Sequence, residues 1–257
     1  MKLSVVIIAF NEEKHIGACI DSALFADEVL VIDSCSSDST VTIAKEKGAK
    51  VIINPWPGFA QQRQFGIEKA QGAWIVFLDA DERITSELKK RIVTISNEND
   101  HPVDGYEIPR RNFVCGREMK HMWPARSLRF FKRAKGSMTL QREVHEKVLI
   151  DGNVSRLKEP MLHYTYDTME QYFTKMNAYT SLLARQSYDK EKKRSLSSLY
   201  GTSVLRFFHY FIDLYISRGA VRDGVFGFYL SLLHAISGMS VYFKIVDLKR
   251  NDNDKTL

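Results

Sequence analysis

The stretch AWIVFLDADE, residues 73–82, is an apolar run that ends in three acidic side chains. A run without polar alternation is typical of a strand in a parallel sheet, because helices cover both faces of such a sheet. Three similar runs precede it, each followed by a stretch with helical character: LSVVIIAF (3–10), EVLVIDS (28–34) and KVIINP (50–55). The repeat of strand and helix predicts an α/β fold with half of a doubly wound, mainly parallel sheet.

Polar side chains follow three of these runs, at the point where each strand is expected to end. Asn11 and Glu12 follow the first run, Asp33 ends the second, and Asp79 and Asp81 end the fourth. Open α/β sheets bind their ligands outside the carboxyl ends of the strands. The sequence therefore predicts one ligand-binding rim that carries all five side chains.

The spacing of Asp79 and Asp81 predicts a divalent cation at this rim. Residues two apart on a strand point the same way and lie roughly 6.5 to 7 Å apart, so both carboxylates face one point if the strand continues. Neighbouring carboxylates repel each other unless a cation is present, and oxygen ligands suit Mg²⁺ or Mn²⁺. The alternative is a solvated turn in which Asp81 caps the next helix.

The other rim residues also have two interpretations. The free amides at a helix start favour an anion after the first strand, whereas Asn11 could instead be an ordinary helix cap. Asp33 is placed to accept hydrogen bonds from a ribose or a base, or to cap the helix after SSDST.

Four segments, taken in order, resemble the family 2 glycosyltransferases of the GT-A fold, and more narrowly the branch with bacterial lipopolysaccharide-core glucosyltransferases. They are SVVIIAFNEE (4–13), VLVIDSCSSDST (29–40), GFAQQRQFGIEKAQGAWIVFLDADE (58–82) and VHEKV (144–148). The resemblance extends to about residue 180. It implies a Rossmann-like, mixed but mainly parallel sheet flanked by helices in residues 1–165, and a helical C-terminal segment in residues 166–257.

The resemblance also implies roles for individual residues. Arg63 would lie near the base or the diphosphate, and Asp79 and Asp81 would form the DxD pair, with Asp81 as the direct metal ligand. His163 resembles a position that reaches the metal or the diphosphate, although a structural histidine is an equal alternative. The nucleotide would be held by Ala9, Phe10, Asn11, Glu12, Asp33, Arg63 and Asp79.

Inverting sugar transfer needs a carboxylate that takes the proton of the acceptor hydroxyl. The segment REVHEKV (142–148) offers Glu143 and Glu146, which would point to opposite faces of a strand, so only one can serve. Glu146 matches the His-Glu position of the family and is the predicted base. The alternative is a glutamate that is ion-paired with Arg129 or Arg142.

A basic and aromatic cluster is the predicted acceptor site. Trp123, Arg126 and Arg129 suit stacking on a sugar and pairing with phosphates. The alternative is a surface loop that is anchored by one tryptophan.

The C-terminal segment combines amphipathic and apolar stretches. SVLRFFHYFIDLYISR (203–218) has a wide apolar arc at helical spacing, and GVFGFYLSLLHAISGMSVYFKIV (224–246) is long enough to span a bilayer but has His234 near its centre. We expect an interfacial hairpin on the cytoplasmic membrane, with Arg218 and Arg222 at phosphate level. The alternative is a buried helical pair in a soluble homodimer.

The net charge and the N-terminal residues indicate the kind of partner and the cellular location. A net charge of +6 and a pI of about 9.1 indicate an anionic partner, but the basic residues are dispersed, so no nucleic acid is expected. The apolar run at 3–10 is too short for a spanning helix and reads as a strand, not a signal. The predicted location is the cytoplasm, at the inner face of a bacterial cytoplasmic membrane.

These observations predict a metal-dependent inverting glycosyltransferase. Its donor would be a nucleoside-diphosphate sugar, with UDP favoured, and its acceptor a membrane-linked glycolipid such as lipopolysaccharide core. A sugar nucleotidyltransferase is one alternative, but the Gly-rich loop expected after its first strand is absent from AFNEE (9–13). A non-catalytic, membrane-associated nucleotide-binding protein is the other, against which stand the intact Asp33, Asp79, Asp81 and Glu146.

Overall fold

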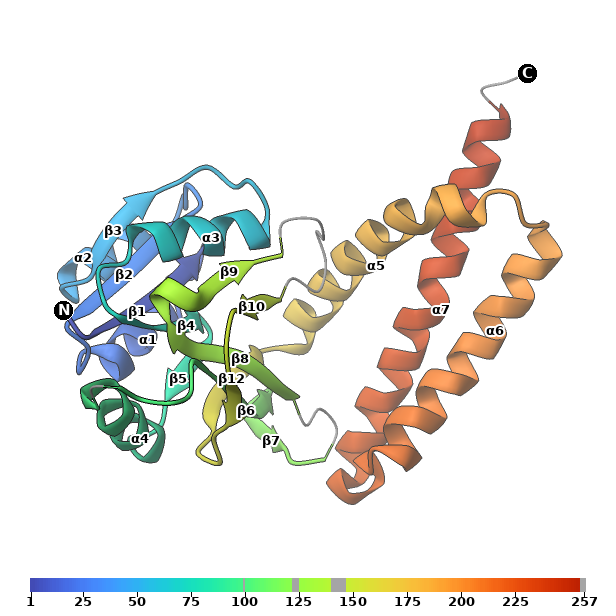
Figure 1. Cartoon of the computed structure of the whole chain (residues 1–257). Coiled ribbons are helices and arrows are strands. Elements are labelled where there is room, and N and C mark those ends of the chain that lie inside the picture. The colour runs from blue at the N-terminus through green and yellow to red at the C-terminus, as the bar shows by residue number, and fades with distance from the viewer. Residues whose placement is uncertain (99, 122–124, 140–146, 255–257) are drawn as a thin grey trace. The chain divides into compact units, whose positions relative to one another are not determined.

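A computed structural model of the chain describes residues 1–98, 100–121, 125–139 and 147–254. The chain forms two compact units (Figure 1). The first comprises Met1–Arg111 and Ala125–Tyr164, and the second comprises Asn112–Pro124 and Thr165–Leu257. Each unit is described separately below.

The first half of unit 1 alternates strands and helices as the sequence predicts. Its elements are β1 (Leu3–Ala9), α1 (Ile16–Ala23), β2 (Glu28–Asp33), α2 (Thr40–Glu46), β3 (Lys50–Ile53), α3 (Phe59–Lys69), β4 (Trp74–Asp79), β5 (Glu82–Ile84) and α4 (Ser86–Asn97).

A strand-rich part follows in place of further helices. Its elements are β6 (Gly105–Val114), β7 (Arg117–Met119), β8 (Ala125–Lys132), the 3-10 turn η1 (Arg133–Lys135), β9 (Gly136–Met138), β10 (Val148–Ile150), β11 (Val154–Arg156) and β12 (Met161–Tyr166). Strands β6 and β12 begin in unit 1 and end in unit 2.

Within the described residues, ten of these strands form one mixed sheet with the core order β3-β2-β1-β4-β8-β6-β12-β5. Strand β1 pairs in parallel with β2 and β4, and β2 pairs in parallel with β3. Strand β8 then pairs antiparallel with β4 and extends the sheet. The predicted GT-A-like fold, a mainly parallel sheet flanked by helices, is confirmed.

Two hydrophobic clusters cover the two faces of the parallel part of the sheet. In β1, Val5 and Ile7 belong to the cluster that includes α1 and α4, whereas Val6 belongs to the cluster on the α3 side. This alternation explains the continuous apolar run, because every side chain of β1 is buried. A Cβ at Gly66 of α3 would come within 2.6 Å of Val6, so this glycine lets the helix approach the sheet closely.

Unit 2 is built mainly from three long helices. They are α5 (Met169–Glu191), α6 (Leu196–Ile212) and α7 (Gly224–Asp254), with the short π-helix η2 (Asp213–Ser217) and the 3-10 helix η3 (Ala220–Asp223) between the last two. Helix α7 packs against both α5 and α6 (Figure 1). The predicted C-terminal helical segment is confirmed.

One helix in the described part of the chain, residues Ala220–Asp252, is long and apolar enough to cross a membrane. Only 28% of its most apolar window is buried inside the protein. Length and composition alone also fit a helix that packs within a soluble protein.

Candidate functional site

The turns after β1 and β2 interlock at the carboxyl rim of the sheet. Asn11 adopts a left-handed conformation with φ of 53°, and its backbone N–H donates to Ser36 Oγ at 2.8 Å. The Asn11 side-chain oxygen in turn accepts from the backbone N–H of Ser37 at 2.8 Å. The structure thus brings two of the predicted nucleotide-binding segments into direct contact.

Neither Asn11 nor Asp33 caps a helix, so those two alternative interpretations are wrong. Helix α1 begins after His15 and α2 after Ser39, several residues beyond either side chain. The fully buried Asp33 carboxylate accepts hydrogen bonds from the backbone N–H and the hydroxyl of Ser36. Asp33 therefore fixes the shape of the second turn from inside.

Asp79, at the end of β4, lies between two arginines from different elements. Arg63 of α3 donates to Asp79 Oδ1 at 2.6 Å, and Arg129 of β8 donates to Asp79 Oδ2 at 2.7 Å. Burial acts to raise the pKa of Asp79, but the two guanidinium groups outweigh it and hold that pKa well below its usual range. The carboxylate is therefore ionised and is already neutralised by protein cations.

Glu82 of β5 completes this charge cluster, and the sequence analysis did not assign it a role. Its side chain is fully buried, accepts from the backbone N–H of Asp79 at 2.9 Å, and accepts from Arg129 at 3.2 Å. Burial raises its pKa, against the opposing effect of Arg129. The signal in the sequence was a third acidic residue directly after the DxD pair.

Asp81 has a different environment from Asp79. Strand β4 ends at Asp79, so Ala80 and Asp81 form a turn, and the extended geometry assumed from the sequence does not continue. Helix α4 is capped by Thr85, so the interpretation of Asp81 as a helix cap is wrong. Its Oδ1 is buried without a hydrogen-bond partner, and its Oδ2 lies 3.6 Å from Nε2 of His163 on β12.

Arg83 holds the turn that carries Asp81. One guanidinium nitrogen donates to the carbonyl oxygens of Ala80 and Glu82 at 2.8 and 2.7 Å, and another donates to the carbonyl of His15 at 2.8 Å. On the other side, the backbone N–H of Tyr164 donates to the Asp81 carbonyl at 2.9 Å. The Asp81 backbone is thus tied to the sheet and to the start of α1.

Sequence comparison identifies the family of the chain. The family model for glycosyl transferase family 2 matches residues 4–161, which is more than half of the chain. The chain belongs to this family.

Full-length relatives agree with this assignment. The lipopolysaccharide core biosynthesis glycosyltransferase LpsC of Rhizobium meliloti is 30% identical over 253 residues, which cover 95% of this chain and 92% of LpsC. An uncharacterized glycosyltransferase of Rickettsia felis is 33% identical over 85% of this chain and 82% of its own. The predicted family and its relation to a lipopolysaccharide-core transferase are confirmed.

Solved structures are more distant. TarS of S. aureus matches with a TM-score of 0.48 and 18% identity, over 71% of this chain and 40% of TarS. A glucosyl-3-phosphoglycerate synthase of Mycobacterium tuberculosis, crystallised with Mn²⁺, UDP and glucosyl-3-phosphoglycerate, matches with a TM-score of 0.38 and 21% identity. This chain spans about half the length of these solved structures, 40% and 57% respectively.

A divalent ion fits the donors that this glycosyltransferase presents at the rim. No group of three His, Cys, Asp or Glu side chains that could hold a metal occurs among the described residues. Asp81 and His163 nevertheless supply two neighbouring donors, and the buried Oδ1 of Asp81 has no other partner. Mg²⁺ commonly binds proteins through one or two carboxylates and takes its other ligands from water and substrate phosphates.

The predicted acceptor and base residues have different positions. Arg126 is exposed and donates to the carbonyl of Leu157 at 2.8 Å, whereas Arg129 is 5% exposed and bound to Asp79 and Glu82. Trp123 and the candidate base Glu146 lie outside the described residues, as do Glu143 and Arg142.

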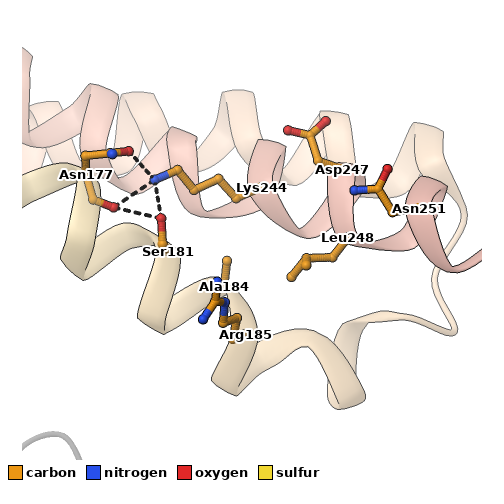
Figure 2. A pocket seen from close by; sticks show the side chains of 8 residues that line it. All are labelled: Asn177, Ser181, Ala184, Arg185, Lys244, Asp247, Leu248 and Asn251. Carbon is orange, nitrogen blue, oxygen red and sulfur yellow. Dashed lines mark hydrogen bonds between the residues drawn. The ribbon is translucent and has the colours of Figure 1, made fainter.

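Unit 2 contains a pocket of about 230 Å³ between α5 and α7 (Figure 2). Lys244 projects from α7 and donates to the carbonyl and side-chain oxygens of Asn177 and to the hydroxyls of Thr180 and Ser181, at 2.7 to 2.8 Å. Its ammonium group has three protons for these four acceptors. The lysine therefore fastens two helices together.

We predict that Asp79→Asn lowers the free energy of unfolding by about 3 kcal/mol near neutral pH, because it leaves two arginines without their shared anion. The pKa of Asp79 is lower in the folded chain than in the unfolded chain. Its contribution is therefore complete above the unfolded pKa of about 4 and declines as the pH falls below that value. Urea unfolding followed by circular dichroism at several pH values measures the difference between variant and wild type.

Asp151→Asn is the matched control, because this side chain is 94% exposed and lies 3.5 Å from Lys135. It should change stability by less than about 1 kcal/mol. Equal stability of Asp79→Asn and wild type at neutral pH would contradict a structural role for Asp79.

Proposed function

We propose that this family 2 glycosyltransferase moves a sugar from a UDP-sugar to a membrane-linked glycan acceptor, such as lipopolysaccharide core, with inversion and with help from Mg²⁺ or Mn²⁺. The observation that carries the proposal is the buried, unpartnered Oδ1 of Asp81, with His163 beside it at the carboxyl rim of the sheet. An ionised side chain without a partner is costly inside a protein unless a cation or a ligand completes its surroundings.

In this proposal the two aspartates of the DxD pair have different roles. Asp81 and His163 would hold the ion, which supplies positive charge opposite the leaving diphosphate when it is bound. Asp79 keeps Arg63 and Arg129 in place instead of contacting the ion, because both of its oxygens already accept charged hydrogen bonds. Arg63 remains near enough to the rim to face the base or the diphosphate.

The nucleotide would lie over the interlocked turns. Ala9, Asn11 and Glu12 shape the first turn, and the Phe10 side chain is 57% exposed there and available for contact with a base or a ribose. Asp33 is fully buried and accepts two hydrogen bonds from Ser36, so it would support the nucleotide site by holding the second turn in shape.

The roles proposed for the acceptor residues follow from the proton and bond changes that sugar transfer requires. Glu146 would take the proton of the acceptor hydroxyl while that oxygen bonds to the anomeric carbon and the bond to the diphosphate oxygen breaks. The nucleoside diphosphate leaves with the electrons of the broken bond. Trp123 and Arg126 would contact the acceptor. Arg129 would not contact the acceptor itself but would hold Asp79 and Glu82 in place through its hydrogen bonds.

The choice of acceptor and location follows from relatives and from composition. LpsC, which is named for lipopolysaccharide core biosynthesis, aligns over 95% of this chain. A basic chain suits an anionic glycolipid at the cytoplasmic face of a bacterial membrane. Because the chain matches the glycosyl transferase family 2 model, a sugar nucleotidyltransferase is no longer a candidate function.

Calorimetric titration of the full chain with UDP, with and without Mn²⁺, tests the nucleotide and metal site. We expect wild type to bind UDP much more tightly when Mn²⁺ is present, and Asp81→Asn to lose this difference, because the amide offers a poorer ligand to a hard cation. Asp151→Asn should behave as wild type, since that side chain is exposed and remote in sequence from the rim.

The deciding quantity is the difference in UDP affinity with and without Mn²⁺. If Asp81→Asn retains it in full, Asp81 is not the metal ligand. If wild type binds none of UDP, ADP and GDP in either condition, the proposed nucleotide site is wrong.

Arg83→Met tests whether the turn of Asp81 must be preorganised. The guanidinium group touches neither Asp81 carboxylate oxygen, but it bonds to the carbonyls on both sides of that residue. We expect affinity for Mn²⁺ in the presence of UDP to fall roughly 10- to 100-fold, as is usual when a support of a metal ligand is removed. Titration of Mn²⁺ followed by electron paramagnetic resonance measures it.

Arg156→Met is the matched control, since Arg156 is 74% exposed and forms a surface ion pair with Glu107 at 2.9 Å. It should leave Mn²⁺ affinity unchanged. Arg83→Lys should recover little, because an ammonium group cannot reproduce the planar donors that reach three carbonyls. Wild-type Mn²⁺ affinity in Arg83→Met would show that the turn forms without this support.

A further inference from the structure

Helix α6 presents an apolar stripe to solvent. Leu205, Phe208, Ile212 and Ile216 follow one another at spacings of three, four and four residues and are 50% to 70% exposed. Such spacing places them along one side of the helix, which continues through η2. This side is therefore apolar but is not covered by the described parts of the protein.

The start of α7 continues the apolar surface around the hairpin. Val221, Val225 and Phe228 are 49%, 86% and 44% exposed. The Phe228 ring lies 5.7 Å from the ring of Phe211 and 5.6 Å from that of Tyr215, which places the two apolar regions next to each other. We refer to these seven exposed residues, Leu205, Phe208, Ile212, Ile216, Val221, Val225 and Phe228, as the tip surface.

The opposite sides of these helices form the interior of unit 2. Leu214, Leu230 and Leu233 are buried in one hydrophobic cluster with Tyr172 of α5. Farther along α7, the charged group of Lys244 is bound by oxygen atoms of α5 (Figure 2). Helix α7 is thus a packed helix of this unit, and the tip surface gathers seven of the apolar side chains that the unit leaves exposed.

Two exposed arginines lie within the tip surface. Arg218 forms an ion pair with Asp213 at 2.9 Å, whereas the Arg222 guanidinium has no ion pair among the described residues. The other acidic residue of the hairpin, Asp223, has an 8% exposed side chain that faces His121. The accessible charge at the tip surface is therefore positive and sits beside apolar side chains.

These features identify the partner by its chemistry. Apolar side chains flanked by arginines match the boundary between acyl chains and anionic headgroups. A second copy of this chain fits less well, because a two-fold contact places the same patch on itself and would bring like charges together. Soluble monomers seldom leave contiguous apolar patches larger than about a few hundred Å² uncovered.

We propose that the tip surface inserts peripherally into the headgroup region of an anionic bilayer, with Arg218 and Arg222 at the level of the lipid phosphates. The inference uses only unit 2 and does not depend on the metal or nucleotide site. It assigns membrane contact to α6, to the α6–α7 turn and to the first residues of α7, and not to an α7 that spans the membrane.

Vesicle flotation of the full chain tests the proposal. Wild type should float with vesicles of phosphatidylethanolamine and phosphatidylglycerol and should bind phosphatidylcholine vesicles weakly. The double variant Ile216→Glu/Val225→Glu should lower the partition coefficient at least about tenfold, because each change removes a side chain from the apolar boundary. Arg222→Glu should weaken binding to the phosphatidylglycerol vesicles roughly tenfold.

Leu182→Glu is the matched control, because Leu182 is a 42% exposed apolar residue of α5 outside the tip surface. It should float as wild type does, and circular dichroism should show equal helix content in all variants. UDP binding in solution should also be unchanged in the double variant, which separates loss of membrane contact from failure of the rim site.

Several outcomes would overturn the proposal. The proposal is wrong if the wild-type protein binds neither kind of vesicle. It is also wrong if the tip-surface variants float as well as the wild type does. Binding that resists alkaline carbonate and is equal on both vesicles would indicate a spanning helix. A wild-type dimer that becomes monomeric in the double variant and does not float would identify a second copy as the partner.

Discussion

The interaction on which the rim depends is the carboxylate of Asp79 held between two arginines. Arg63 comes from a helix that packs on the parallel strands, and Arg129 comes from the antiparallel strand next to β4. Glu82 bonds to the backbone of Asp79 and to Arg129, which joins the next strand to the same cluster. Without this shared anion, Arg63 and Arg129 would both lose the carboxylate that they bind, and Glu82 would remain on Arg129 alone.

The hydrogen bonds of this cluster are made by Asp79 and Glu82, whereas Asp81 Oδ2 lies 3.6 Å from His163 Nε2. Its turn is fixed by backbone hydrogen bonds from Arg83 and Tyr164, while one carboxylate oxygen stays buried and unpaired. A protein that needed only stability would not keep such a group. The cost is reasonable if, as proposed, the substrate carries a diphosphate and arrives with a cation, because the site would then already be shaped for the charge that develops.

Local patterns were enough to predict the parallel half of the sheet and the residues at its rim. Continuous apolar runs gave the strands from Leu3 to Asp79, and the rule for ligand position placed Asn11, Asp33 and Asp79 together. The separation of roles between Asp79 and Asp81 could not be predicted, because it depends on where β4 ends and on Arg129, fifty residues later. Arg129 was expected at the acceptor, but its burial follows from the pairing of β8 with β4, which no local pattern encodes.

Asp79 therefore stabilises the fold, whereas Asp81 is the aspartate proposed to bind a ligand. The most direct test is the free energy of unfolding of Asp81→Asn in metal-free buffer, compared with wild type. We predict that the variant is at least as stable, because the buried Oδ1 has no hydrogen bond to lose and the 3.6 Å between Oδ2 and His163 Nε2 is longer than a hydrogen bond. A loss of about 3 kcal/mol, the size expected for breaking a buried ion pair, would contradict the central claim.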